Sequence, residues 1–230
     1  MKQSDASPVK ILAFEFSSPQ RSVAVVDEAQ NEKRRASAEV LEIGDSGTRG
    51  IGMIDVALQQ ARVEREQIEL IAVGLGPGSY NGIRLSIAMA QGWQLASGEP
   101  GIKVLGISSA ECIVAEASSE GMEGQVTIII HAQRGEFYAS KYELASRNWR
   151  ELEPLLLLSM EDVRKRETAG EHLIGPEVPK WFGRGSLVFP RAATLGRLAL
   201  SKSNFISAEK MEPIYLRVPQ FVKAPPARNL

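Results

Sequence analysis

The chain has little cysteine, no long apolar run and no excess of either charge. Cys112 is the only cysteine among 230 residues, so no disulfide can form within the chain, which fits a reducing compartment. The late apolar run at residues 155–158 is far too short to span a bilayer. Residues 1–10 lack the apolar core of a signal peptide. We therefore expect a cytoplasmic protein without a membrane segment.

The charge balance gives no support to independent binding of nucleic acid. The 27 basic and 28 acidic residues leave a formal net charge of -1, so no basic excess is available to neutralise phosphates. If RNA is part of the function, we expect another subunit to hold it. The apolar share of 43% is ordinary for a globular protein, and the length suits one large domain or two small lobes.

Hydrophobic patterning predicts two similar α/β halves, each with a strand hairpin and helices. The first half is expected to contain strands at 9–16, 22–27, 35–43, 70–73 and 104–107, and helices at 51–62 and 83–96. The second half is expected to contain a hairpin of strands 126–131 and 136–144, then shorter elements, and a helix at about 192–202. The resulting boundaries are a first lobe at 9–107, a connecting helix at 108–119, a second lobe at 120–218, and flexible tails at 1–8 and 223–230.

The most informative stretch is VGLGPGSYNGIR, residues 73–84, between a predicted strand and a predicted helix. Gly74, Gly76 and Gly78 can adopt positive φ, Pro77 has a fixed φ, and Ser79 can cap the helix that follows. Such a loop either points backbone N–H groups at an anion or makes a tight strand-to-helix connection. It is not a P-loop, since no Gly-Lys-Ser/Thr follows. Arg84 opposes the helix dipole, so it either braces the loop or meets an anion or acidic partner.

Five segments resemble the TsaB (YeaZ) family. GLGPGSYNGIRLSIAMAQGWQLA resembles the family signature GxGPGSFTGxR, which is followed by a helix ending in AKGLA. ILAFEFSS resembles ILAIDTS, VLGISSAECIVAEA resembles VGVSSLEALA, HAQRGEFYASKYE resembles DARKGEVYAALYE, and MEPIYLR matches PxYLR. The segments occur in the family's order over residues 10–218. The GPGS block is specific to this family and to its larger paralogue TsaD.

The resemblance implies an α/β fold of the actin/hexokinase/Hsp70-like (ASKHA) type, with two lobes that each hold a mixed sheet flanked by helices. It also implies a scaffold or activator subunit of the tRNA N6-threonylcarbamoyladenosine (t6A) synthase. Such a subunit docks the transferase TsaD, and with it the ATPase TsaE, and forms a homodimer when TsaD is missing. Contact with tRNA would come only through the complex.

The two phosphate turns that the family fold implies depart from those of its active relatives. Glu15 and Phe16, followed by Ser17, stand where the family has Asp-Thr, and His131 stands at an Asp position in the second turn. Phe16 lacks a hydroxyl for phosphate, and neutral imidazole is a poor ligand for Mg²⁺. We therefore expect no catalytic residue, no metal site, and at most weak binding of ATP or ADP, alone or at a partner interface.

Two other functions stay open as alternatives. A small-molecule kinase or ATPase of the same fold needs an adenosine loop in the second lobe, and GRGS at 183–186 is its one weak candidate. A peptidase is disfavoured because no H-E-x-x-H is present and Cys112 lies in a predicted helix as a small buried residue. His131 and His172 are too far apart for the H-x-x-x-H metal pair of TsaD.

The two predicted helices of the first half are apolar on more than one side, which favours burial against a second chain as well as against the sheet. The resemblance implies that these helices bind TsaD. The expected contact residues are Ile51, Met53, Ile54, Leu58, Met89 and Trp93.

Overall fold

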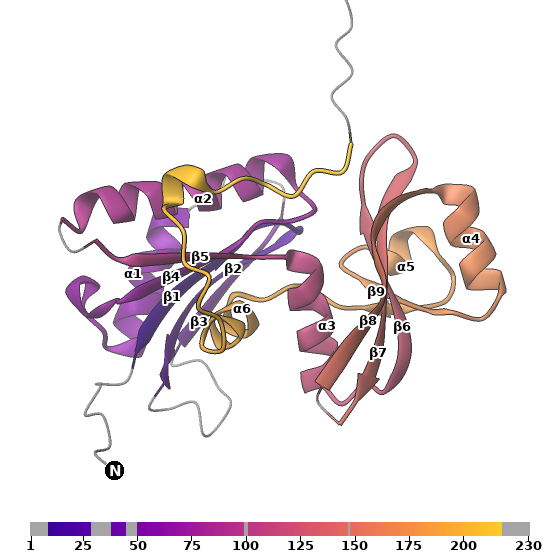
Figure 1. Ribbon diagram of the computed structural model, residues 1–230, viewed down its shortest axis with the longest axis horizontal. Helices are drawn as coiled ribbons and strands as arrows, with labels where there is room; N and C mark the ends of the chain where they lie inside the picture. The colour runs from indigo at the N-terminus through magenta and orange to yellow at the C-terminus, as the bar shows by residue number, and fades with distance from the viewer. Residues whose placement is uncertain (1–8, 29–37, 45–49, 99–100, 147, 218–230) are drawn as a thin grey trace, which may run out of the picture.

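Two lobes lie side by side in the computed structural model, which describes residues 9–28, 38–44, 50–98, 101–146 and 148–217 (Figure 1). Each lobe is built on a five-stranded mixed sheet. The sheet of the first lobe has the order β3-β2-β1-β4-β5. Its strands are β1 (Lys10–Glu15), β2 (Gln20–Asp27), β3 (Ala38–Ile43), β4 (Leu70–Gly74) and β5 (Lys103–Ile107).

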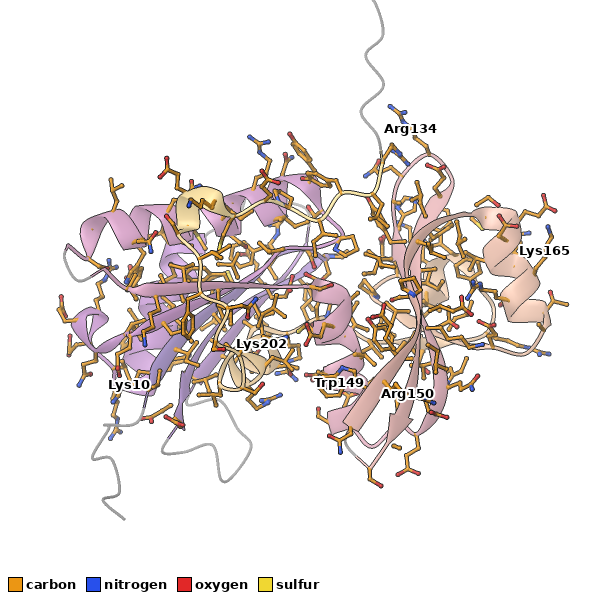
Figure 2. The ribbon with its side chains drawn as sticks, in the orientation of Figure 1. Lys10, Arg134, Trp149, Arg150, Lys165 and Lys202 are labelled. Carbon is orange, nitrogen blue, oxygen red and sulfur yellow. The ribbon has the colours of Figure 1, made fainter. Side chains whose placement is uncertain are left out.

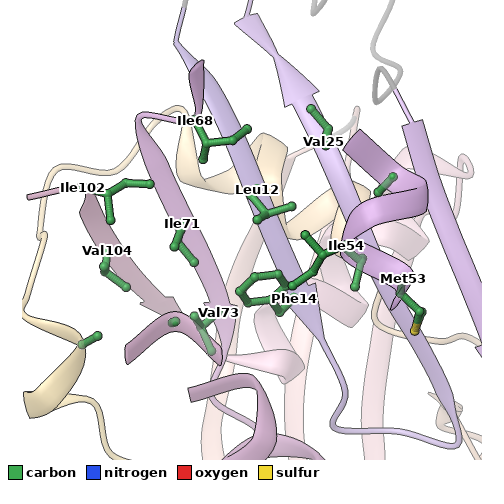
Figure 3. Close-up of a cluster of buried hydrophobic side chains, with 14 of the residues drawn as sticks. Leu12, Phe14, Val25, Met53, Ile54, Ile68, Ile71, Val73, Ile102 and Val104 are labelled. Carbon is green, nitrogen blue, oxygen red and sulfur yellow. The ribbon is translucent and has the colours of Figure 1, made fainter. Parts of the chain in front are cut away.

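Strand β1 is at the centre of the first sheet and is apolar on both faces. It pairs antiparallel with β2, as the predicted hairpin requires, and parallel with β4. Helices α1 (Gly50–Ala61) and α2 (Tyr80–Ala96) cover one face, where Leu12 and Phe14 belong to the core cluster (Figure 3). Helix α6 (Ala192–Ala199) covers the other face, over Ile11 and Ala13. Burial of both faces explains the nearly continuous apolar sequence of β1.

The second sheet has the order β10-β9-β6-β7-β8. Its strands are β6 (Gly124–His131), β7 (Glu136–Ala145), β8 (Asn148–Ser159), β9 (His172–Gly175) and β10 (Ser186–Leu187). The predicted hairpin of residues 126–131 and 136–144 is confirmed, since β6 and β7 pair antiparallel with His131 opposite Phe137. Helix α3 (Ser109–Ser119) packs on one face, and α4 (Met160–Thr168) and α5 (Val178–Trp181) pack on the other.

The expected lobe boundaries need one correction, because the chain returns to the first lobe after the second sheet. Helix α6 packs on β1 and β2, and the short 3-10 helix η3 (Ala208–Lys210) packs on α2. Ala208 and Met211 are buried in the same core cluster as Phe14. The region 120–218 is therefore not one lobe: residues 124–188 form the second lobe, and residues 192–211 complete the first. The predicted tails at 1–8 and 223–230 lie outside the described residues.

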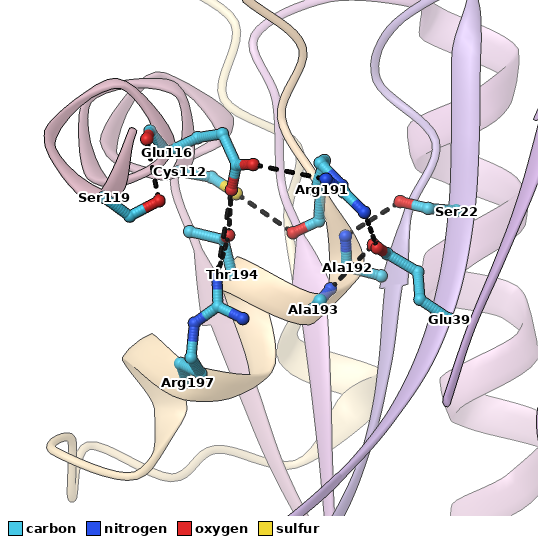
Figure 4. Close-up of polar contacts among 10 residues, drawn as sticks. All are labelled: Ser22, Glu39, Cys112, Glu116, Ser119, Arg191, Ala192, Ala193, Thr194 and Arg197. Carbon is cyan, nitrogen blue, oxygen red and sulfur yellow. Dashed lines mark hydrogen bonds and ion pairs between the residues drawn. The ribbon is translucent and has the colours of Figure 1, made fainter. Parts of the chain in front are cut away.

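A polar network joins the two lobes where α3 meets α6 (Figure 4). The Arg191 guanidinium pairs with Glu39 of β3 and, at 3.5 Å, with Glu116 of α3. The Glu116 carboxylate also accepts from the Thr194 hydroxyl of α6. Glu116 is buried and the Glu39 side chain is only 8% exposed, so these contacts replace the water that the carboxylates lose on folding. The network fixes α3, which carries the second sheet, against the first lobe.

Within the described ranges, no helix combines the length and apolar character that crossing a membrane requires.

Candidate functional site

Glu15, at the end of β1, is fully buried. Its Oε1 atom accepts from the Ser17 backbone N–H at 2.8 Å, and its Oε2 atom accepts from the Ser109 hydroxyl at 2.8 Å. Desolvation raises the pKa of Glu15, and the bonds from Ser17 and Ser109 oppose that shift. Both carboxylate oxygens are therefore engaged by the chain itself, at the turn where the resemblance implies contact with phosphate and metal.

The glycine loop uses its backbone N–H groups inside the chain. The Gly76 N–H donates to Ser109 Oγ at 3.1 Å, and the Ser79 N–H donates to the Ser17 carbonyl at 2.7 Å. Ser79 caps α2 as expected, because its Oγ atom accepts from the Gly82 N–H at 3.3 Å. Of the two interpretations that the sequence leaves open, this geometry favours the tight connection over an anion cradle.

Three glycines allow the loop to lie directly on the first turn. A Cβ atom at Gly74 would lie 2.1 Å from Glu15 Oε2, and one at Gly78 would lie 2.1 Å from the Ser17 carbonyl oxygen. A Cβ atom at Gly82 would lie 1.9 Å from the carbonyl oxygen of Phe16. Gly78 also has φ 149, and the Gly76–Pro77 peptide bond is cis. Close packing of loop on turn is thus the reason for glycine at these positions.

Phe16 belongs to the hydrophobic core. Its side chain is fully buried in the cluster beneath α1, and a Cβ atom at Gly50 would lie 3.2 Å from the ring. Phe16, which stands where the resemblance implies a hydroxyl, therefore packs the first turn against α1.

His131, at the end of β6, is half-buried in an aromatic cluster of the second lobe. Its ring centroid lies 4.7 Å from that of Trp181 and 5.4 Å from that of Phe137. His172 is distant in the sheet and shares a 2.9 Å hydrogen bond with Ser186 at the exposed edge. No group of three or more metal-ligating side chains is present among the residues that the structure describes.

The Cys112 thiol lies within α3 and is buried, as expected. Its Sγ atom donates to the Arg191 carbonyl at 3.3 Å. Burial, with the nearby carboxylate of Glu15 second, raises the pKa of Cys112 well above its ordinary value, which disfavours the nucleophilic thiolate.

Arg84 braces the start of α2. Its guanidinium donates to the Tyr80 hydroxyl at 2.8 Å and lies 5.1 Å from the centroid of the Tyr80 ring. Tyr80 in turn stacks on Tyr215, with ring centroids 5.6 Å apart. The segment 208–217, called the C-terminal segment below, is thereby attached to the end of α2 that follows the glycine loop. The sequence pattern did not predict a role for either tyrosine, although Tyr80 lies in GLGPGSYNGIR and Tyr215 lies in MEPIYLR.

The expected contact set on α1 and α2 needs a correction. Met53, Ile54 and Leu58 point into the first core, and Ile54 is only 4% exposed. They lie on the side of α1 that packs on β2 and β3, and of the three only Ile54 also reaches the groove described below. Ile51, by contrast, is 70% exposed, and Met89 and Trp93 are half-buried on α2.

Ile51, Met89 and Trp93 line one groove between the two helices. The groove has a volume of about 1090 Å³ and continues past residues 68–70 and 101–103 to Ala199 and Leu200. Leu85, Ala88 and Ala96 add apolar surface from α2. Arg65 marks the rim: it pairs with Asp55 and lies 5.4 Å from the centroid of the Trp93 ring. An apolar centre with a charged rim is typical of protein-docking surfaces.

Comparisons with known proteins agree with this architecture. A family profile described as "TsaD: tRNA N6-adenosine threonylcarbamoyltransferase" matches residues 48–207. The chain is 27% identical to "tRNA threonylcarbamoyladenosine biosynthesis protein TsaB" of Escherichia coli K12 over 182 residues, which are 72% of this chain and 78% of that protein. It is 29% identical over 90 residues to the protein of the same name from Buchnera aphidicola, or 39% of this chain and 41% of that one.

Two solved structures share the fold. "YeaZ from Pseudomonas aeruginosa" has a TM-score of 0.73 at 25% identity, and the match covers 90% of this chain and 100% of that one. A structure titled as an uncharacterized protein with similarity to peptidase YeaZ, from Pseudomonas aeruginosa, has a TM-score of 0.74 at 24% identity. That match covers 91% of this chain and 100% of the other. Both confirm the two-lobe ASKHA-like architecture.

Proposed function

The chain belongs to the TsaD family, described as tRNA N6-adenosine threonylcarbamoyltransferase, and on that basis we propose that it acts in the biosynthesis of tRNA threonylcarbamoyladenosine as a TsaB-type subunit. The observation that carries the proposal is the match to TsaB of Escherichia coli over 78% of that protein. The chain works beside a transferase and does not itself carry out the transfer. This role belongs to the cytoplasm, where the tRNA is modified.

The geometry of the first turn supports a non-catalytic role. Both oxygens of Glu15 accept hydrogen bonds from the chain, and the glycine loop lies on the turn where phosphates would need space. In the second lobe, the His131 ring packs against the Trp181 ring at an interplanar angle of 32°. Neither turn offers a free hard oxygen ligand for the magnesium ion of a nucleotide.

The partner in this proposal is TsaD, which TsaE joins, and a second copy of the chain takes the same surface when TsaD is absent. The groove of Ile51, Met89 and Trp93 supports this assignment, because monomeric proteins rarely leave large contiguous apolar surfaces uncovered. TsaD would hold the tRNA. Helix pairs from two chains would pack about 8–10 Å apart.

Depletion of the protein in its own organism tests the proposed function. Bulk tRNA is digested to nucleosides, and t6A is measured by mass spectrometry before and after depletion. We expect the t6A level to fall on depletion and the parent gene to restore it. A t6A level that persists after complete depletion would refute the proposal. A titration of the isolated chain with MgATP checks the non-catalytic role, which a low-micromolar, magnesium-dependent affinity would contradict.

A further inference from the structure

A second surface, away from the groove, combines exposed aromatic rings with arginines. It forms where the start of α2, the C-terminal segment and the turn between β6 and β7 come together (Figure 1). Tyr80 is 54% exposed and Tyr215 is 41% exposed, although their rings stack at 5.6 Å with an interplanar angle of 21°. The Tyr80 ring is contacted by Tyr215 and by the Arg84 guanidinium, so Tyr215 is the ring with an exposed part left open.

Three arginines come from the elements that meet here. Arg84 lies over the Tyr80 ring, and Arg134 is exposed at the tip of the β6–β7 turn, with φ 55 (Figure 2). Arg217 donates to the carbonyls of Ala132 at 3.1 Å and Gln133 at 3.4 Å, so the C-terminal segment is tied to the same turn. We call Tyr80, Arg84, Arg134, Tyr215 and Arg217 the tyrosine–arginine surface.

The charges of this surface are only partly compensated. Glu136 of β7 pairs with Arg217, and the acidic residues of the segment 208–217 are Glu209 and Glu212. Arg84 and Arg134 make no ion pair among the residues that the structure describes. The surface thus carries a local positive charge on a chain whose formal net charge is -1.

The bonds of Arg217 already hold the C-terminal segment to the second lobe, and the Ile214 N–H holds it to the Leu75 carbonyl at 2.8 Å. The exposed part of the Tyr215 ring and the uncompensated charges of Arg84 and Arg134 are more than such an attachment requires. Exposed aromatic rings stack with unpaired bases, and arginines beside them meet phosphates. A buried apolar centre, which a protein-docking surface needs, is lacking among these five side chains.

We propose that the tyrosine–arginine surface binds a single-stranded stretch of RNA, with a base on the exposed part of the Tyr215 ring and phosphates on Arg84 and Arg134. The identity of the RNA as a tRNA rests on the proposed function, in which the tRNA is otherwise held by the transferase. With two or three phosphates neutralised, the affinity is low. The logarithm of the binding constant should fall with the logarithm of the salt concentration at a slope of about -0.7 per phosphate.

The test uses the full chain and two probes: an unmodified transcript of the tRNA substrate and a short oligouridylate, both fluorescein-labelled. Ultraviolet crosslinking and mass spectrometry should identify peptides that contain Tyr80 or Tyr215. Arg134→Glu and Tyr215→Ala should each weaken binding about tenfold, and Arg134→Glu should make the salt dependence shallower. Tyr215→Phe keeps the ring and should bind like the parent.

Matched controls lie elsewhere on the chain. Arg164→Glu changes an exposed arginine of α4, and Phe205→Ala removes an exposed ring that packs on Lys103, so both should leave binding unchanged. The inference fails if Arg134→Glu and Tyr215→Ala bind RNA like the parent, or if the parent gives no crosslink at either tyrosine. It also fails if these variants lose TsaD capture while their RNA crosslinks persist. The two proposals can fail separately. If Arg134→Glu and Tyr215→Ala weaken RNA binding as expected but depletion of the protein leaves t6A unchanged, only the proposed function is refuted.

Discussion

The Ser109 hydroxyl donates to Glu15 Oε2 at 2.8 Å and accepts from the Gly76 N–H at 3.1 Å. One small side chain therefore connects the end of β1, the glycine loop and the start of α3. Ser108 is the N-cap of this helix and makes no side-chain cap bond, so Ser109 is its first residue. The Ser109 hydroxyl therefore satisfies two buried polar groups.

Replacing Ser109 with alanine should destabilise the folded state. The change leaves Oε2 of Glu15 and the Gly76 N–H without their partner, and buried unsatisfied groups cost about 1–3 kcal/mol each. We expect a loss of about 2–3 kcal/mol in the free energy of unfolding, measured by urea denaturation. Ser119→Ala, at the exposed end of the same helix, should cost less than about 1 kcal/mol. Equal effects of the two changes would contradict this account.

Gly74→Ala should be strongly destabilising, because the new methyl would lie 2.1 Å from Glu15 Oε2. The carboxyl is buried and bonded on both oxygens, so it cannot move aside cheaply. We expect a loss of more than about 2 kcal/mol by denaturation. The matched change Gly52→Ala, where a Cβ meets nothing within 4 Å on α1, should instead stabilise by about 0.5–1 kcal/mol.

Shortening Glu15 to aspartate tests why Gly74→Ala should lower the free energy of unfolding. If the clash with the carboxyl is responsible, Glu15→Asp should be less harmful in the Gly74→Ala background than in the parent. A double-mutant cycle measures the coupling between the two positions. Strictly additive effects would show that Gly74 is required for a reason other than Glu15.

The stability contribution of Glu15 should depend on pH in a defined direction. Burial raises the pKa of Glu15 above its ordinary value of 4.5, so the folded protein holds the proton at pH values where the unfolded chain has lost it. This contribution is complete below pH 4.5 and is lost as the pH rises through the folded-state pKa. Denaturation of the parent and of Glu15→Gln across this range should show the parent losing stability relative to the variant as pH rises. A constant difference would contradict the raised pKa.

Charges placed on the two sides of α1 should have different effects. Ile54→Glu buries a carboxylate beneath the helix and should unfold the first lobe, whereas Ile51→Glu should leave the fold intact because Ile51 is 70% exposed. If the groove docks TsaD, Ile51→Glu should cost about 2 kcal/mol or more in binding, as at other interface centres. Circular dichroism checks the fold, and calorimetry with purified TsaD measures the affinity. Parent-like affinity for Ile51→Glu would place the interface elsewhere.

Periodicity predicted the two hairpins and the helices of the first lobe because each has an unbroken pattern. The predicted helix 83–96 begins three residues earlier, at Tyr80, since Ser79 caps it. The twelve-residue strand β8 was missed, because Pro154 and alternating glutamates interrupt its pattern before the leucines. The return of α6 to the first sheet could not be predicted either, since eight residues of helix do not reveal which sheet they cover.

The candidate site was predictable only in part, for a related reason. Sequence alone located Glu15, the glycine loop and the apolar helices, but an apolar stripe does not show whether it faces its own sheet or a partner. Met53, Ile54 and Leu58 were assigned to the partner for that reason and are core residues. The pairing of Ser109 with Glu15 spans 94 positions of the chain, and no local pattern signals it.

The return of α6 to the first sheet also sets the order in which the protein can mature on the ribosome. The second sheet and its three helices are encoded in one uninterrupted stretch, so they can assemble as soon as residue 188 has emerged. The first sheet, although synthesised earlier, must wait with the Ile11 face of β1 uncovered until Leu195 and its neighbours arrive. The half of the protein that is translated first is thus the half that is finished last.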